Sequence, residues 1–164
     1  MNIFFLHKNP KKCAKYYVDQ HVVKMILETA QLLCTAIWSC GGTAPYKSTH
    51  ANHPCAVWTR QSKDNWNWLY SLAVALCEEY TYRYGKVHAT QEIVQNLKVP
   101  DLPEKEFVNP PQCMPDCYKD ENTIIAYRNY YIIGKIRLHC FKTRHAWKNR
   151  EIPKFIVKAL YTWN

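Results

Sequence analysis

One long apolar segment near the N-terminus constrains the fold of this 164-residue chain more than any other feature. Residues 22–34 read VVKMILETAQLLC, and nine of these thirteen residues are apolar. Apolar side chains on nearly every side predict a helix that is buried in a protein core. We expect this central helix to cover about residues 19–38, with Asp19 as its N-cap and Cys40-Gly41-Gly42 as its stop.

Four polar residues interrupt this segment and fall on one helical face: His21, Lys24, Glu28 and Gln31. Burying such groups costs free energy unless each one meets a partner or a ligand. We therefore predict a catalytic site formed by Glu28, His21 and Lys24. Glu28 and Lys24 would act as an acid/base pair, or Lys24 would be an amine nucleophile. The alternative is a satisfied structural network, because a Lys–Glu pair four residues apart is a common surface salt bridge.

Further helical patterns, separated by turn residues, occupy the rest of the chain. We predict a long helix over about residues 55–84, with a break near residues 62–65 and Gly85 at its end. Shorter helices are expected at residues 88–97, at 121–142 and after Pro153, whereas the proline-rich residues 99–120 predict a long loop. The expected fold class is all-α, a single compact helical domain over residues 1–164.

The N-terminal sequence and the cysteines bear on the cellular compartment. No run reaches the roughly 20 apolar residues of a membrane span, and the first apolar patch precedes its charges, the reverse of a secretory signal. Eight cysteines are scattered along the chain, as in proteins of a reducing compartment. We expect an intracellular monomer without a membrane partner.

A polar loop follows the central helix and carries the second group of candidate residues. Its sequence TAPYKSTHANHP holds His50, Asn52 and His53, and Arg60 follows shortly after. We predict that these four residues bind substrate from a loop that faces the central helix. The alternative is that Asn52 caps the next helix and His53 packs against the protein.

The same loop contains residue types that suit zinc. His50, His53 and Cys55 form the pattern His-x-x-His-x-Cys, and His88, Cys113 or Cys117 could complete a site. The spacing matches no common zinc pattern, and Cys113 to Cys117 is a C-x-x-x-C run with an internal proline. We therefore expect no metal ion and no cofactor.

The C-terminal residues 142–164 alternate basic and aromatic side chains. The formal net charge of the chain is +9. Cations bind phosphate, and aromatic rings offer stacking surfaces for unpaired bases. We predict that this segment binds DNA through Lys142, Arg144, Trp147, Lys148 and Arg150. The alternative is a basic tail whose aromatic residues dock it to the body of the protein.

Several catalytic motifs are absent from the sequence. With only four glycines there is no phosphate-binding glycine loop, and neither a GxSxG nor an HExxH motif occurs. Hydrolysis of nucleoside triphosphates and metalloprotease chemistry are therefore not expected.

The segment DQHVVKMILE resembles the early helix of the pyrimidine-dimer DNA glycosylases of the T-even phage type. In that family an Asp-Gln-His triplet is followed, seven residues after its His, by the catalytic Glu, and His21 and Glu28 have this spacing. Residues 53–85 resemble the family's long middle helix. The C-terminal stretch is similar in composition to the part that contacts DNA. The order of these features also resembles proteins of tailed phages and large DNA viruses, which implies a viral origin and a location in the host cell.

The resemblance implies a small, basic, all-helical enzyme of DNA repair. In the family the N-terminal amine, exposed after removal of the initiator Met, forms an imine with the sugar of the damaged nucleotide, and the carboxylate assists ring opening and strand cleavage. Glu28 would be that carboxylate and His21 a nearby helper. Asn2 is larger than the side chains that usually permit Met removal, so the nucleophile would be Lys24 or the amine of Met1.

Two arginines of the family's early helix are missing, because Leu27 and Gln31 stand near those places. The base or lesion recognised is therefore left open. The function predicted is that of a DNA glycosylase with lyase activity on a modified or damaged base. The alternatives are a non-enzymatic DNA- or RNA-binding viral protein and an enzyme that acts on free nucleotides.

Overall fold

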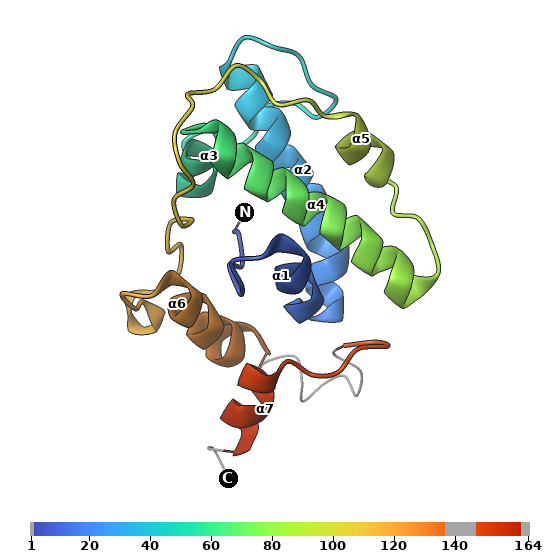
Figure 1. Cartoon of the computed structure of the whole chain (residues 1–164), viewed down its shortest axis with the longest axis vertical. Helices are drawn as coiled ribbons and strands as arrows, with labels where there is room; N and C mark the ends of the chain where they lie inside the picture. Colours follow the sequence, from blue (N-terminus) through green and yellow to red (C-terminus); the bar gives the residue numbers. More distant parts are fainter. Residues whose placement is uncertain (1, 137–146, 162–164) are drawn as a thin grey trace.

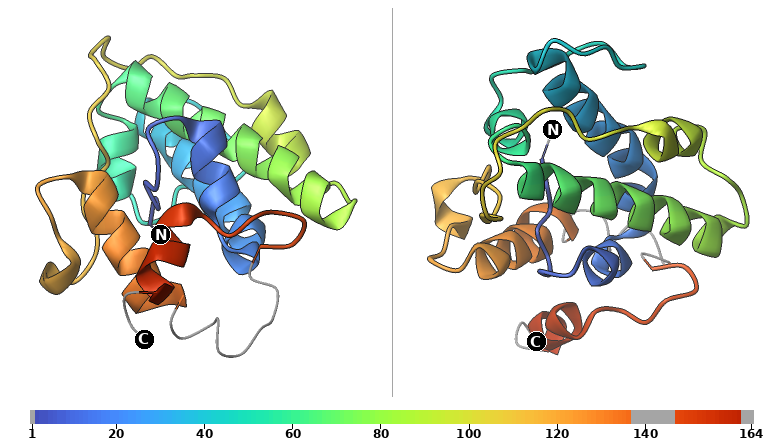
Figure 2. Two further views of the ribbon diagram at one scale, coloured as in Figure 1. Left: turned by 60° about the horizontal axis from the view of Figure 1, so that its bottom comes forward. Right: turned by 45° about the horizontal axis from the view of Figure 1, so that its top comes forward.

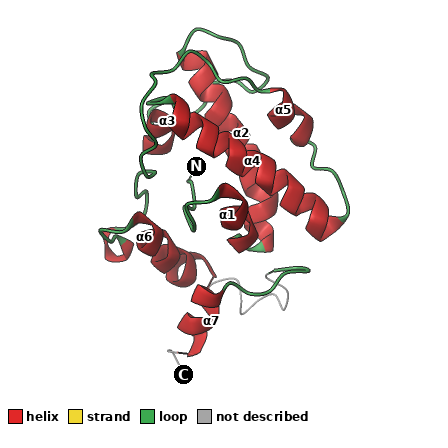
Figure 3. Cartoon of the chain, in the orientation of Figure 1, coloured by secondary structure: helices red, strands yellow, loops and turns green. Residues whose placement is uncertain are grey.

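The computed structural model describes residues 2–136 and 147–161, and in these ranges it contains helices and loops but no β-strand (Figure 3). This confirms the all-α fold class. The α-helices are α1 (Pro10–Tyr16), α2 (Asp19–Ser39), α3 (Pro54–Thr59), α4 (Lys63–Tyr84), α5 (Gln91–Asn96), α6 (Thr123–Asn129) and α7 (Lys154–Tyr161). A short 3-10 helix, η1 (Asp116–Tyr118), precedes α6, and a π-helix, η2 (Tyr130–Ile136), continues it.

The two longest helices, α2 and α4, cross at the centre of the molecule, and α1 packs on α4 (Figure 1). Their facing side chains, among them Ile26 and Leu33 of α2 and Leu69 and Leu76 of α4, are fully buried. Burial of one such side chain contributes about 1.5–3 kcal/mol. The central apolar helix predicted from sequence is therefore confirmed, one residue longer than expected.

The exposure of α2 differs from the expectation of a helix buried on nearly every side. Val23, Leu27 and Trp38 are each 39% exposed. By length and composition alone α2 is long and apolar enough to cross a membrane, which the search for apolar runs in the sequence missed. More than half of its apolar window is buried in the protein, as in the core helix of a soluble domain.

The N-terminus of α2 also differs from the prediction. Val18, not Asp19, is the N-cap residue, and no side chain caps the helix. The Asp19 carboxylate instead accepts hydrogen bonds of 2.8 Å from Nη1 of Arg83 and of 3.0 Å from the backbone N–H of Lys148. A carboxylate gains more from a fully buried guanidinium than from a helix N–H group, so the ion pair replaces the cap.

Residues 55–84 form two helices, where the sequence pattern predicted one long helix with a break. The chain leaves α3 at Arg60 and enters α4 after Ser62, whose hydroxyl accepts a hydrogen bond of 3.1 Å from the Asn65 N–H. A serine side chain in this position starts a new helix in preference to continuing an old one. Gly85 ends α4 with φ of +64°, as predicted, because glycine adopts the left-handed conformation without strain.

The N-terminal segment, residues 2–8, is extended and runs between α4 and α6 before it enters α1 (Figure 2). Residues Ile3 to Leu6 are buried, and the ring of Phe5 contacts Trp68 of α4. On the other side, the guanidinium of Arg128 donates hydrogen bonds to the Leu6 carbonyl. This segment is therefore part of the core.

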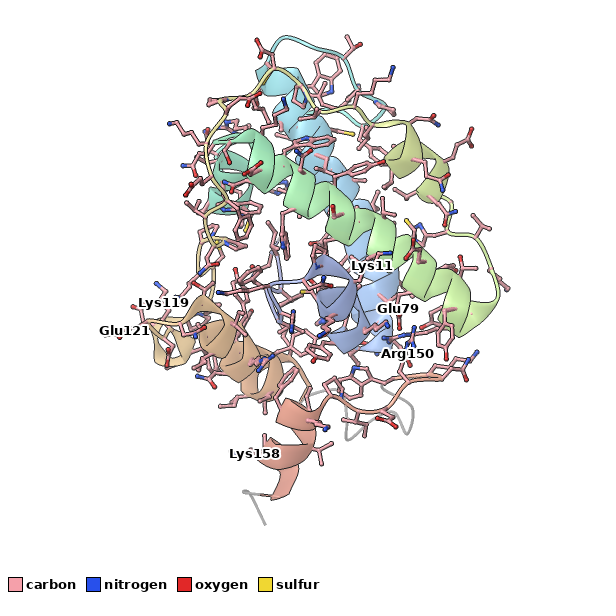
Figure 4. All side chains as sticks on the ribbon, in the orientation of Figure 1. Lys11, Glu79, Lys119, Glu121, Arg150 and Lys158 are labelled. Atoms are coloured by element: carbon pink, nitrogen blue, oxygen red, sulfur yellow. The ribbon has the colours of Figure 1, made fainter. Side chains whose placement is uncertain are left out.

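The C-terminal residues 147–161 lie against the body of the protein. Trp147 is buried, and its indole N–H donates a hydrogen bond of 3.1 Å to the Tyr16 carbonyl. Arg150 points toward Glu79 of α4 (Figure 4) and donates two hydrogen bonds of 2.9 Å to its carboxylate. This part of the C-terminal segment therefore docks through both its aromatic and its basic side chains.

Candidate functional site

A pocket of about 280 Å³ lies where the N-terminal segment, α2, the start of α3 and the α6–η2 segment meet. This volume is near the lower end of the roughly 300–1,000 Å³ that small-molecule sites occupy. The wall is mostly polar and ionisable, and it consists of Asn2, Phe4, His21, Lys24, Met25, Glu28, His53, Tyr130 and Lys135. All three predicted catalytic residues and one predicted substrate-binding residue therefore line a single cavity.

Glu28 and Lys24 lie one turn apart on α2, at the pocket. Nζ of Lys24 is 3.2 Å from Oε1 of Glu28, and the side chains are 71% and 17% exposed, respectively. Glu28 is therefore the more enclosed partner, and the Lys24 amine extends from the pocket wall into solvent. The surface salt bridge considered from sequence exists, but its carboxylate faces a cavity.

His21 is held in a fixed orientation by aromatic neighbours. Its ring stacks on Phe4 with centroids 4.6 Å apart and an interplanar angle of 14°. Its Nδ1 lies 2.9 Å from the hydroxyl of Tyr131, which also accepts a hydrogen bond of 2.7 Å from the Val18 N–H. When the hydroxyl donates to Nδ1, both contacts are satisfied and the neutral imidazole carries its proton on Nε2.

His53 is the N-cap residue of α3, and its Nδ1 accepts a hydrogen bond of 3.1 Å from the Cys55 N–H. The alternative in which Asn52 caps this helix is therefore wrong. Burial lowers the pKa of His53, and the charge of His50 acts in the same direction, whereas the charge of Glu28 opposes both. These influences together favour the neutral form of the imidazole.

The other three predicted substrate-binding residues lie outside the pocket wall. His50 and Asn52 are exposed, and the imidazole of His50 bonds the neighbouring Thr49 hydroxyl at 2.7 Å. Arg60 donates a hydrogen bond to the carbonyl of Ala51 and so braces the loop that carries His53. Contact of these residues with a long substrate stays a prediction.

Five lining residues were not predicted as site residues from the sequence: Asn2, Phe4, Met25, Tyr130 and Lys135. The side-chain amide of Asn2 donates a hydrogen bond of 2.7 Å to the Cys113 carbonyl, and its Oδ1 accepts one of 2.9 Å from the Tyr127 hydroxyl. The wall next to the chain's first residue is therefore anchored. In the sequence analysis only Asn2 indicated this part of the wall, because the resemblance places the reactive N-terminal amine at the residue after Met1.

A cluster of soft ligands adjoins the pocket. The ligand atoms of His53, Cys55 and Cys113 all lie within 4.8 Å of one another, and the two Sγ atoms are 3.7 Å apart. A hydrogen bond from the Cys55 thiol lowers the pKa of Cys113 to about 7. The same bond, together with burial, raises the pKa of Cys55. Of the zinc ligands considered from sequence, the structure thus gathers these three, while His50, His88 and Cys117 lie outside the cluster.

The predicted DNA-binding residues have different environments. Lys142 and Arg144 lie outside the described residues. Lys148 is exposed, and its Nζ lies 5.3 Å from the ring centroid of Tyr84. Trp147 is buried, and Arg150, whose side chain is 25% exposed, is bound to Glu79. Contact of these residues with a nucleic acid stays a prediction.

A larger groove of about 460 Å³ lies between α4 and α5, but its composition differs from that of the pocket. Its lining contains one carboxylate, Glu78, and no lysine, arginine or histidine. A groove of this kind has neither a general acid/base pair nor an amine. The smaller pocket at Glu28 is therefore the candidate active site.

A comparison with protein families finds a match to the model for pyrimidine dimer DNA glycosylase over residues 1–93. The matched region covers more than half of the chain and runs from the N-terminal segment into α5. This chain belongs to the pyrimidine dimer DNA glycosylase family. A search of curated proteins and a search of solved structures each found no match.

The family match confirms the resemblance seen in the segment DQHVVKMILE, and at family level it assigns the chain a DNA glycosylase-like function on a DNA substrate. The matched region of this pyrimidine dimer DNA glycosylase family member contains His21, Lys24, Glu28 and His53. Tyr130 and Lys135 complete the pocket from beyond that region, and Tyr131, also beyond it, bonds His21. The viral origin stays a prediction.

Proposed function

We propose that the pocket at Glu28 is the active site of a DNA glycosylase with an associated lyase step that acts on a modified or damaged base. The observation that carries the proposal is the placement of Glu28. It faces a cavity of about 280 Å³ together with His21, His53 and two lysine amines, all within or beside the region matched by the family. An amine and a carboxylate in one pocket are the two groups that imine chemistry requires.

The first step is attack of an amine on C1′ of the damaged nucleotide. The amine nitrogen forms a bond to C1′ while the glycosidic bond breaks, and the base leaves with the electron pair and takes up a proton. The nucleophile is Lys24 or the amine of Met1, the residue before the anchored Asn2. The Glu28 carboxylate takes the proton that the attached amine nitrogen loses and passes it to the ring oxygen as the sugar opens and the imine forms.

The second step is strand cleavage. The Glu28 carboxylate, having given up its proton, removes one from C2′, and the bond between C3′ and its oxygen breaks with departure of the phosphate. Water hydrolyses the imine and restores the amine. His21, fixed by Phe4 and Tyr131, is placed to bond the sugar or the leaving base through Nε2.

Access to the pocket requires that the nucleotide leave the duplex. Extrusion of a base costs a few kcal/mol, least for a damaged base whose stacking is already weakened. The half-buried aromatic ring of Tyr130 in the pocket wall offers a stacking surface that offsets this cost. The net charge of +9 attracts the phosphate backbone and supports DNA as the substrate.

The lesion is proposed only as a modified or damaged base. Leu27, at a position where the family has an arginine, is 39% exposed on α2. It offers an apolar contact where a cation would bind phosphate or a base edge. A panel of duplex oligonucleotides that carry different lesions, with free nucleosides as a further arm, distinguishes repair of DNA from action on free nucleotides.

The test of the proposal is borohydride trapping on a lesion-containing oligonucleotide. Glu28→Gln keeps the size of the side chain and removes its proton transfer, so we expect strand cleavage to fall by about 10²-fold or more while DNA binding is retained. Glu92→Gln, an exposed carboxylate on α5, is the matched control and keeps full activity. Absence of any trapped adduct in the wild type across the panel would favour the non-enzymatic DNA-binding alternative.

A further inference from the structure

The cluster of His53, Cys55 and Cys113 joins two parts of the chain that are distant in sequence. His53 is the cap of α3, Cys55 lies in its first turn, and Cys113 comes from the long proline-rich loop. The backbone carbonyl of Cys113 in turn accepts the hydrogen bond from Asn2. The cluster thus lies where the loop, α3 and the N-terminal segment meet.

The distance between the two sulfur atoms of the cluster matches that of a tetrahedral zinc site. Two thiolates that bind one zinc at about 2.3 Å are about 3.8 Å apart, and a thiolate and an imidazole nitrogen on that ion are about 3.6 Å apart. The two Sγ atoms here are 3.7 Å apart, and all three ligand atoms lie within 4.8 Å of one another. Little rearrangement is needed for one ion to reach all three.

We propose that His53, Cys55 and Cys113 bind one zinc ion, which ties the proline-rich loop to the start of α3 beside the pocket. The three protein ligands leave the fourth tetrahedral position to a water molecule. A ligand set of one imidazole and two thiolates favours zinc over magnesium or calcium, which prefer oxygen ligands. The proposal concerns metal binding and not the glycosylase reaction. It is therefore tested by the metal content of the protein, without any substrate.

The Nδ1 atom of His53 accepts a hydrogen bond of 3.1 Å from the Cys55 N–H. Zinc bound through Nδ1 would exchange this helix-cap hydrogen bond for a metal–ligand bond.

The test uses the full chain, purified under reducing conditions and without a histidine tag, with zinc measured by plasma mass spectrometry. We expect one zinc per chain in the wild type and about a tenfold lower content in Cys113→Ser. Cys117→Ser is the matched control, because Cys117 is an exposed thiol of the same loop outside the cluster, and it retains zinc.

Cobalt replacement gives a second readout that does not depend on folding yield. The cobalt protein is expected to show thiolate-to-cobalt charge-transfer absorption in the near ultraviolet. This absorption should weaken in Cys113→Ser. Because Cys113 is half-buried, we expect the variant to keep its fold, which circular dichroism checks. A wild-type chain that folds without zinc and gives no such band overturns the proposal. So does full zinc content in Cys113→Ser, or a Cys55–Cys113 disulfide seen as a loss of two hydrogens in the intact mass.

Discussion

The hydroxyl of Tyr131 lies 2.9 Å from Nδ1 of His21, so a residue beyond the family-matched region orients a side chain of the candidate active site. Tyr131 is fully buried and also contacts Phe4, on which the His21 ring stacks. The pocket therefore depends on the second half of the chain for the orientation of a residue supplied by the first. Variants that remove these contacts therefore test whether the pocket is the active site.

Tyr131→Phe removes the hydroxyl and keeps the ring. We expect strand cleavage to fall by about tenfold, because His21 loses the bond that sets its tautomer and orientation. The Val18 N–H loses its acceptor as well, which lowers the free energy of unfolding by about 1–3 kcal/mol. Single-turnover cleavage measured against pH separates the two effects, since destabilisation alone leaves the shape of the pH profile unchanged.

The control for this variant is Tyr82→Phe. The Tyr82 hydroxyl likewise bonds a backbone group, the Asn149 carbonyl to which it donates, but it is exposed and lies outside the pocket wall. Both the pH profile and the rate should stay at wild-type values. An unaltered profile in Tyr131→Phe would show that the hydroxyl does not position His21.

The identity of the nucleophile is tested by mapping the trapped adduct. An α-amino group ordinarily loses its proton near pH 8 and a lysine amine near pH 10, both approximate values, so more of the former is nucleophilic at neutral pH. We expect Lys24→Ala to keep the borohydride-trapped adduct, with cleavage reduced by less than about tenfold through loss of a phosphate contact. Peptide mass mapping should place the adduct on the N-terminal peptide. Loss of the adduct in Lys24→Ala, with folding and DNA binding intact, would assign the reaction to Lys24.

Glu79 makes stability depend on acid pH. Burial alone would raise its pKa, but hydrogen bonds and charge from Arg150 and Arg83 outweigh burial and hold the pKa below its ordinary value. A carboxylate with a depressed folded-state pKa contributes stability above its unfolded pKa and loses it as pH falls through the folded pKa. We expect the free energy of unfolding to decrease as pH drops from about 5 to below 4.

Urea unfolding of Glu79→Gln checks this dependence. At neutral pH the variant should be less stable by about 3–5 kcal/mol, because Arg83 is fully buried and loses a charged partner. The stability of the variant should also change less between neutral and acid pH than that of the wild type. Glu104→Gln, which removes an exposed ion pair with Lys63, should behave like the wild type. Equal acid sensitivity of both variants would mean that another group carries the pH dependence.

Two leucines on α2 test the orientation of the central helix. Leu33 is fully buried, so Leu33→Ala should lower the free energy of unfolding by about 2–5 kcal/mol through lost burial and the cavity left behind. Leu27 is 39% exposed, so Leu27→Ala should cost less than about 1 kcal/mol. Chemical denaturation gives both values. Equal losses would mean that the helix is rotated from the position described.

The local sequence pattern determined the central helix and the grouping of its polar side chains. The spacing of His21, Lys24 and Glu28 puts them on one face of any helix, because the helical period is fixed by the backbone. The same holds for the end of α4 at Gly85, where only glycine avoids strain. These features follow from residues within a few positions of one another, so the sequence was enough to predict them.

Only the tertiary structure decided which groups surround that face. Asn2 and Cys113 meet across 111 positions, and His21 and Tyr131 across 110, so no local periodicity indicates either contact. Asp19 binds Arg83 and does not cap α2, and Arg150 binds Glu79, because buried charges take the strongest partner that the folded chain brings near. The pocket at Glu28 exists because packing of distant segments closes it, and long-range packing leaves no periodic signal in the sequence.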